Sequence, residues 1–358
     1  AFARMGLFEQ PSKPLMLTLS GLSIILGYFS WKFIEKYFRD RQKNSQKKIF
    51  IYSFIGLCAF TLLGLFGHYK NDLAYVGLFN PYQKIHRLTD KAYFPDNKVL
   101  QTGSWLLLRK LSKDKNYKTI NNKFDNELWF DPAATSKRLL LIGNSHSKDI
   151  YNIVSQNELF LKKFQVARYG LQINHLNVDH KLWASPNYLS ATHILIASRY
   201  SDEDVDVISM NIAKMLSDGK KVSIASNIFE FPGKASGYSL IDEIVLKNIN
   251  QITTNNLAKI ANLVNKQYFN YYQTTQTNHS NNVNLRISKI AKLHKIPFIN
   301  RMDYICEETV EMCYAVDDNL SKNFYDYGHH TLSGALYFAR SDLFPNFLNN
   351  LDGLNIYK

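Results

Sequence analysis

The sequence predicts an α/β domain, in which a parallel sheet is covered by helices on both faces, preceded by two transmembrane helices. Three observations support this: two uncharged apolar segments early in the chain, short apolar runs alternating with helical patterns from Lys137 onward, and a net charge of +13 concentrated beside the apolar segments. With 358 residues, 46% hydrophobic and 20% charged, the chain is neither disordered nor fibrous and is long enough for two units. Its three cysteines exclude a small disulfide scaffold.

The two apolar segments, residues 14–31 and 49–67, contain no charged side chain. As helices each is about 27–29 Å long, which matches the hydrocarbon core of a bilayer, about 30 Å thick. Residues 32–48 between them hold seven Lys or Arg and two acidic residues. Loops rich in Lys and Arg stay in the cytoplasm. We therefore expect the chain from His68 onward to lie on the opposite side of the membrane, which in a bacterium is the periplasm. The alternatives are buried helices of a globular protein and, for 32–48, a nucleic-acid-binding patch.

Residues 68–135 have poor periodicity and predict a linker that partly packs on the following domain. Beyond it, apolar runs predict strands at 138–143, 193–198, 221–226 and 297–300, with a further possible strand at 164–168. Helical patterns lie at 147–156, 202–219, 239–268 and 284–295, and from Leu332. Because parallel sheets bind ligands at the carboxyl ends of their strands, residues that follow a strand are the first candidates for a site.

Gly143-Asn144-Ser145-His146 lies where a predicted strand gives way to a helix. A serine there projects from the carboxyl edge of the sheet, beside the free N–H groups of the helix, which can hold an oxyanion. The alternative is that Ser145 is only an N-cap. Near the other end, Asp326 precedes His329 by three residues, so its carboxylate can orient the imidazole toward a nucleophile. The alternative is two polar residues in a surface turn.

Together these motifs resemble the SGNH hydrolase pattern, whose first block is Gly-Asp-Ser and whose last is Asp-x-x-His. The continuation, residues 330–335 (HTLSGA), resembles the form in SGNH domains fused to acyltransferase-3 membrane proteins, with His330 in place of a Leu. Residues 30–39 (SWKFIEKYFR) resemble the end of the last helix of that membrane domain, departing from it at Trp31 and Tyr37.

The resemblance implies an SGNH-hydrolase-like (flavodoxin-like) sheet and a division of the chain into four parts. Residues 1–48 would be the last transmembrane helix of an acyltransferase-3 domain with its polybasic loop, and 49–67 a linking transmembrane helix. Residues 68–135 would be a periplasmic linker and 136–358 the catalytic domain. The chain begins at Ala1 without a visible signal peptide, and we expect it to be part of a longer protein.

For the site, the resemblance implies a triad of Ser145 as nucleophile, His329 as base and Asp326 as its orienting carboxylate. It also implies an oxyanion hole made by the backbone N–H groups of Ser145 and His146, with Gly170 in the place of the second-block glycine. Asn144 stands where the family has Asp. The third-block Asn has no clear counterpart, and Arg199 stands near its place. His146 is interpreted as structural, because adjacent side chains on such a turn rarely converge.

The family often carries a cysteine pair before its last block, so the resemblance implies a disulfide between Cys306 and Cys313 that braces the Asp326/His329 loop. Two free thiols are the alternative, and Cys58 is expected to be a packing residue in a membrane helix. The sequence contains no HExxH, CxxC or glycine-rich phosphate loop, so we expect no metal site and no bound cofactor in this chain.

The resemblance implies a multi-pass protein of the bacterial inner membrane with its last domain in the periplasm. Its activity would be O-acyl transfer, in particular O-acetylation of a surface polysaccharide such as lipopolysaccharide O-antigen. Acetyl-coenzyme A would be the donor for the full-length protein, handled by an upstream acyltransferase-3 membrane domain. The expected partners are therefore the bilayer, that domain and the polysaccharide, and no nucleic acid. A periplasmic carbohydrate esterase and a non-catalytic sugar-binding module remain as alternatives.

Overall fold

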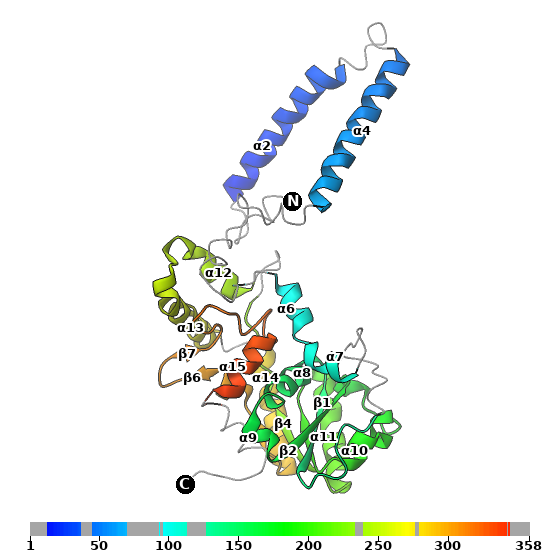
Figure 1. Ribbon diagram of the computed structural model, residues 1–358, viewed down its shortest axis with the longest axis vertical. Helices are drawn as coiled ribbons and strands as arrows, with labels where there is room; N and C mark the ends of the chain where they lie inside the picture. The colour runs from blue at the N-terminus through cyan, green and yellow to red at the C-terminus, as the bar shows by residue number, and fades with distance from the viewer. Residues whose placement is uncertain are drawn as a thin grey trace. The chain divides into compact units, whose positions relative to one another are not determined.

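The computed structural model describes residues 13–36, 45–69, 93, 96–112, 127–232, 239–275, 279–341 and 343. The chain divides into two compact units, residues 1–84 and 85–358. Figure 1 shows the first unit as two long helices and the second as a sheet surrounded by shorter helices.

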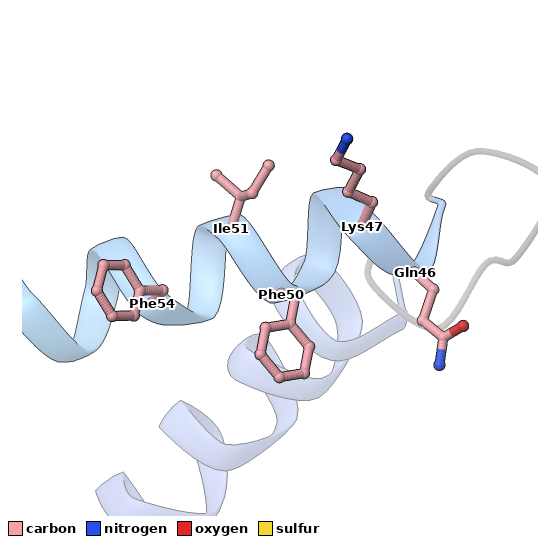
Figure 2. A pocket seen from close by; sticks show the side chains of 5 residues that line it. All are labelled: Gln46, Lys47, Phe50, Ile51 and Phe54. Carbon is pink, nitrogen blue, oxygen red and sulfur yellow. The ribbon is translucent and has the colours of Figure 1, made fainter.

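The first unit contains α2 (Lys13–Phe29), which continues as a π-helical segment, η1 (Ser30–Glu35), and α4 (Gln46–Tyr69). No residue of α2 is buried, an unusual surface for a helix bathed in water. Among the described residues, one helix, Lys13–Phe33, is long and apolar enough to cross a membrane. Figure 2 shows the start of α4, where Phe50, Ile51 and Phe54 line an open pocket together with Gln46 and Lys47. The second predicted span is thus helical, but its membrane crossing stays a prediction.

The second unit is built on a parallel sheet with the strand order β2-β1-β3-β4-β5. Its strands are β1 (Lys137–Gly143), β2 (Phe164–Gly170), β3 (His193–Ile196), β4 (Lys221–Ala225) and β5 (Phe298–Ile299). The four residues Leu139–Ile142 are all buried, as expected for a strand covered on both faces. The predicted parallel sheet is confirmed, including the possible strand at 164–168. In this order the connections diverge between β1 and β3, where such folds place their ligands.

Helices cover both faces of the sheet (Figure 1). The helices of this unit from β1 onward are α8 (Ser145–Val154), α9 (Glu158–Leu161), α10 (Pro186–Ser190), α11 (Asp202–Ser217), α12 (Leu240–Lys247), α13 (Leu257–Thr274), α14 (His279–His294) and α15 (Leu332–Arg340). Two of them, α12 and α13, pack on each other beside the sheet and do not cover its faces. Alternate strand residues such as Leu140 and Ile142 join one core with α11 and α14. Because side chains alternate along a strand, Leu139 and Leu141 face the opposite side, the side on which α8 packs against β1 and β2 and α15 packs on α8.

Two regions differ from the sequence expectation. The helical pattern over 239–268 is broken into α12 and α13 by two 3₁₀ turns, η5 (Ile249–Gln251) and η6 (Thr254–Asn256). Thr253 and Asn256 cap each other's backbone there and begin a new helix, a signal that apolar periodicity does not report. The predicted irregular linker contains α6 (Asn97–Gly103) and α7 (Leu106–Ser112). Residues 70–92, 94–95 and 113–126 of it lie outside the described residues.

Short elements complete the unit. They are the 3₁₀ turns η3 (Ile173–His175), η4 (Lys181–Ala184) and η7 (Arg301–Tyr304), and the antiparallel pair β6 (Cys306–Glu307) and β7 (Met312–Cys313). Because η7 follows β5 directly, it brings its residues to the same edge as the turn between β1 and α8.

Candidate active site

The turn between β1 and α8 places Ser145 at the carboxyl edge of the sheet. Gly143 has a φ of +146°, and a Cβ on it would lie 2.0 Å from the carbonyl oxygen of Ala197. Only glycine therefore allows β1 to end this close to the neighbouring strand. Asn144 is the N-cap of α8, since its Oδ1 accepts from the backbone N–H of His146 at 3.2 Å. Ser145 is the first residue of the helix, so the interpretation of Ser145 as the cap is wrong.

Ser145, His329 and Asp326 are joined in one hydrogen-bonded relay. The Oγ of Ser145 lies 2.7 Å from Nε2 of His329, and Nδ1 of His329 lies 2.8 Å from Oδ2 of Asp326. A carboxylate only accepts hydrogen bonds, so it places the imidazole proton on Nδ1. The lone pair on Nε2 is then free to accept the hydroxyl proton of Ser145, which is the geometry required of a nucleophile and its base.

The loop between Asp326 and His329 is held by its own carboxylate. Oδ1 of Asp326 accepts from the backbone N–H of Gly328 at 3.0 Å and of His329 at 2.8 Å. Burial alone would raise the pKa of Asp326, but the hydrogen bond and charge of His329 and these two N–H groups lower it below its ordinary value. The carboxylate therefore stays ionised, as its orienting role requires.

The predicted oxyanion residues are only partly brought together. Ser145 is in the first turn of α8, where the backbone N–H has no acceptor within the helix. The N–H of His146 already donates to Asn144. Gly170 pairs in register with Gly143 at the end of the adjacent strand. The guanidinium of Arg199 donates to Glu230 at 2.5 and 2.8 Å, and the backbone N–H of Arg199 donates to Asn144 Oδ1 at 3.1 Å. The oxyanion roles of these four residues stay predictions.

A buried charged cluster, which the sequence did not predict, lies beneath the relay. It consists of Lys148, Asp149 and Arg301, none of which has any exposed surface. Lys148 Nζ lies 2.7 Å from Asp149 Oδ1, and Arg301 Nη1 lies 2.8 Å from Nδ1 of His146. In the sequence, Lys148 and Asp149 are indistinguishable from residues on the exposed polar face of an amphipathic helix. Arg301 had a usable signal, because it comes two residues after β5, at the edge where sites form.

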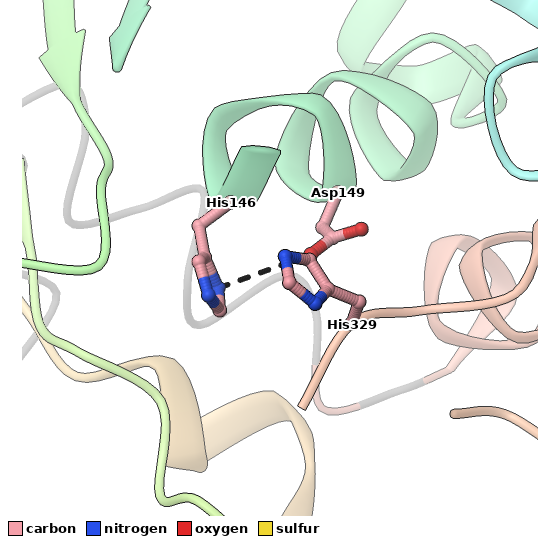
Figure 3. A group of neighbouring side chains, drawn as sticks. All are labelled: His146, Asp149 and His329. Atoms are coloured by element: carbon pink, nitrogen blue, oxygen red, sulfur yellow. Dashed lines mark ion pairs between the residues drawn. The ribbon is translucent and has the colours of Figure 1, made fainter. Parts of the chain in front are cut away.

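Three side chains of this region have the composition of a metal site, but they do not fit a metal. His146, Asp149 and His329 bring possible ligand atoms within 4.8 Å of one another, and Figure 3 shows the contact between His146 Nδ1 and Asp149 Oδ2, which are 3.9 Å apart. Both ring nitrogens of His329, however, are engaged by Ser145 and Asp326. Nδ1 of His146 faces the guanidinium of Arg301. A cation placed there would meet a positive charge and find few free lone pairs.

Cys306 and Cys313 are joined by a disulfide across the β6–β7 pair. The residues that follow Cys313 contact the segment just before the loop between Asp326 and His329: the backbone N–H of Asn323 donates to the carbonyl of Ala315 at 2.9 Å, and Asn323 Nδ2 donates to the carbonyl of Tyr314 at 3.0 Å. The disulfide thus closes a hairpin that contacts η7 and is followed by residues bonded to Asn323, three residues before Asp326. Cys58, in α4, is a free cysteine.

The family model described as the SGNH domain fused to AT3 domains matches residues 114–341, which include the sheet, the Ser145 turn and the Asp326/His329 loop. One similar solved structure is the periplasmic domain of the lipopolysaccharide acetyltransferase of Salmonella ser. Paratyphi A, with 14% identity, a TM-score of 0.41 and coverage of 74% of this chain and 100% of that chain. Another is a GDSL-like lipase from Bacteroides thetaiotaomicron, with 18% identity, a TM-score of 0.29 and coverage of 60% and 86%. The search of curated proteins found no match.

Proposed function

Because this chain belongs to the family of SGNH domains fused to AT3 domains and is an enzyme that handles acyl groups, we propose that it is an O-acyltransferase that acetylates a cell-surface polysaccharide. The observation that carries this proposal is the relay from Asp326 through His329 to Ser145, with hydrogen bonds of 2.8 and 2.7 Å. Those distances lie within the range needed for proton transfer from a nucleophile to its base.

In the proposed reaction, His329 Nε2 takes the hydroxyl proton of Ser145 while Oγ attacks the carbonyl carbon of the donor's acyl group. The tetrahedral oxyanion collapses, the donor's carrier leaves with the proton from His329, and Ser145 holds the acyl group as an ester. A sugar hydroxyl then loses its proton to His329 and attacks this ester. As the second tetrahedral intermediate collapses, His329 returns this proton to Oγ of Ser145, and the products are the acylated sugar and the free hydroxyl of Ser145.

We further propose the surroundings in which this reaction takes place. The acyl group would come from acetyl-coenzyme A in the cytoplasm, through an AT3 membrane domain of the full-length protein. The helix Lys13–Phe33 would anchor the chain in the bacterial inner membrane, with α4 as a second span and the SGNH domain in the periplasm, beside the polysaccharide. The positive charge of residues 32–48 supports this orientation.

A carbohydrate esterase is the second candidate, because water can replace the sugar hydroxyl in the same relay. The observation in its favour is that Ser145, His329 and Asp326 are already hydrogen-bonded to one another within the unit of residues 85–358. The third candidate is a sugar-binding module without catalysis. The complete relay of Ser145, His329 and Asp326 makes this candidate the least favoured.

The first test measures hydrolysis of p-nitrophenyl acetate by the full chain in detergent. We expect Ser145→Ala to lower the rate by about 10³-fold or more, because it removes the nucleophile. Ser155→Ala is the matched control: this serine caps the end of the same helix and its Oγ donates to the carbonyl of Asn152 at 3.3 Å, so the rate of this variant should stay near that of the wild type. An unchanged rate in Ser145→Ala would refute acyl transfer through this residue.

The second test separates transfer from hydrolysis. Cells that carry the full-length protein should contain O-acetylated surface polysaccharide, and the acetyl content should disappear with Ser145→Ala. If instead the wild-type protein lowers the acetyl content of a polysaccharide acetylated by another enzyme, the esterase is the correct assignment.

A further inference from the structure

His146 lies directly against the base of the proposed relay. Its ring stacks on the ring of His329, with centroids 4.3 Å apart and planes inclined by 27°, and only 1% of its surface is exposed. The interpretation of His146 as merely structural assumed that neighbouring side chains on this turn rarely converge. At the start of α8, however, the main chain turns so that Ser145 reaches the edge of His329 and His146 reaches its face.

Arg301 determines the tautomer of His146. Its Nη1 donates to His146 Nδ1 at 2.8 Å, and a guanidinium has no atom that can accept a proton. Nδ1 must therefore be unprotonated, so the neutral ring carries its proton on Nε2. That atom lies 3.4 Å from the hydroxyl oxygen of Tyr327, which can accept the hydrogen bond. Arg301 is itself held in place, because its backbone N–H donates to Ser226 Oγ at 2.9 Å.

The groups around His146 also favour its neutral form. Burial lowers its pKa most, followed by the electrostatic influence of His329, Arg301, Lys148 and His330. Asp149, 3.9 Å from Nδ1, is the one carboxylate close to the ring among the described residues, and it is paired with Lys148 at 2.7 Å. The remaining titratable neighbour is Tyr327, whose pKa burial raises to about 12, so it carries no charge near neutral pH.

We propose that Arg301 and His146 form a positioning pair for the base, in which Arg301 keeps the His146 ring neutral and this ring holds His329 in line with Ser145. The positioning pair rests on the proposed function, because its role is to hold His329, the general base of that reaction. When His329 takes the proton of Ser145 it becomes an imidazolium. A neutral ring against its face stabilises that cation, whereas a protonated His146 would repel it.

The test measures how kcat/KM for p-nitrophenyl acetate depends on pH, using the full chain in detergent. Arg301→Gln keeps an N–H donor for Nδ1 but removes the charge, so His146 protonates at higher pH and the acid limb should move upward by about one pH unit. Arg301→Lys is the matched variant: it keeps the charge, so its acid limb should stay at the wild-type midpoint, whatever its turnover. An unchanged midpoint in Arg301→Gln would overturn the proposal.

His146→Asn supplies the complementary measurement, because Asn Oδ1 can replace Nδ1 as the acceptor for Arg301 while the stacked ring is lost. We expect kcat to fall about 10–100-fold with little change in KM. In the double variant His146→Asn/Arg301→Gln, the shift of the acid limb should vanish, because the titrating ring is absent. A shift that persists there would contradict the pairing.

Two outcomes keep the proposal distinct from the function on which it rests. If Arg301→Gln does not fold, as judged by thermal unfolding, His146→Asn decides alone, and wild-type turnover in that variant would refute the pair. If Ser145→Ala is inactive while all pair variants behave as the wild type, the positioning role fails and the acyl-transfer assignment stands.

Discussion

At the scale of single residues, Asp326 decides which nitrogen of His329 carries the proton. Its two oxygens divide their tasks: Oδ2 accepts from the ring, and Oδ1 accepts from two backbone N–H groups of its own loop. Because its folded-state pKa is lowered, this interaction contributes stability above the ordinary carboxyl value of about 3.9. It is lost only as the pH falls through the lower, folded-state pKa.

Asp326→Asn should therefore lower the kcat of ester hydrolysis by about 10³–10⁴-fold. An amide N–H facing Nδ1 forces the ring proton onto Nε2, and Nε2 then has no lone pair to accept the hydroxyl proton of Ser145. Oδ1 of the new Asn can still accept from the loop N–H groups, so the protein should stay folded. Asp318→Asn, at an exposed position on a nearby loop, is the control and should keep the wild-type rate. Hydrolysis by Asp326→Asn at near wild-type rate would remove Asp326 from the mechanism.

The triad could be predicted from the sequence because each member lies in a short motif with a known structural position. The position of Arg301 just after a strand was a usable signal, but the burial of Arg301 and Lys148 could not be predicted, because burial of a charge depends on which elements pack above it. Arg301 is covered only when η7 folds back toward the start of α8, and residues 146 and 301 are far apart in the sequence. His146 was predicted as an oxyanion donor through its N–H and as structural in its ring, but the contact of that ring with His329 requires coordinates.

At the scale of elements, the turn from β1 to α8 depends on Gly143. Two demands coincide there: a φ of +146°, and a hydrogen atom where any other residue would place Cβ 2.0 Å from the carbonyl oxygen of Ala197. The same turn presents the nucleophile, so stability and activity depend on the same few atoms. The sequence predicted the strand, the turn and the helix correctly, since their apolar runs are strong, but not the break between α12 and α13, which depends on capping.

Gly143→Ala should lower the free energy of unfolding by about 2–4 kcal/mol, because backbone strain and the clash with Ala197 add. Gly219→Ala is the matched control: this glycine also has a positive φ, +76°, but a Cβ on it would meet nothing within 4 Å. Its substitution should cost about 1 kcal/mol. Denaturant unfolding of both variants checks the difference, and equal losses would show that the close approach to Ala197 is not a constraint.

At the scale of the whole second unit, the fold begins before the residues that the family model matches. That match starts at residue 114, yet Ser104 is fully buried and contacts α8 twice. Its Oγ accepts from Lys148 Nζ at 2.9 Å, and its carbonyl accepts from Asn152 Nδ2 at 2.7 Å. The sequence predicted only partial packing here, because short helices such as α6 and α7 leave too little periodicity to recognise. The segment before the match is therefore part of the support beneath the site.

Ser104→Ala should lower the free energy of unfolding of this unit by about 1–3 kcal/mol, because it takes an acceptor from a buried ammonium group that water cannot reach. Lys148 would then be left with a long hydrogen bond of 3.5 Å to the hydroxyl of Tyr325 and with Asp149, which also accepts from the backbone N–H of His330 at 3.3 Å, so ester hydrolysis should fall as well. Ser217→Ala is the control: its Oγ bonds to a carbonyl three residues back, as Ser104 Oγ does, but on an exposed helix end. That change should stay within about 0.5 kcal/mol of the wild type. If both serine variants unfold at the same denaturant concentration, the segment 96–112 is an appendage and not a part of the catalytic fold.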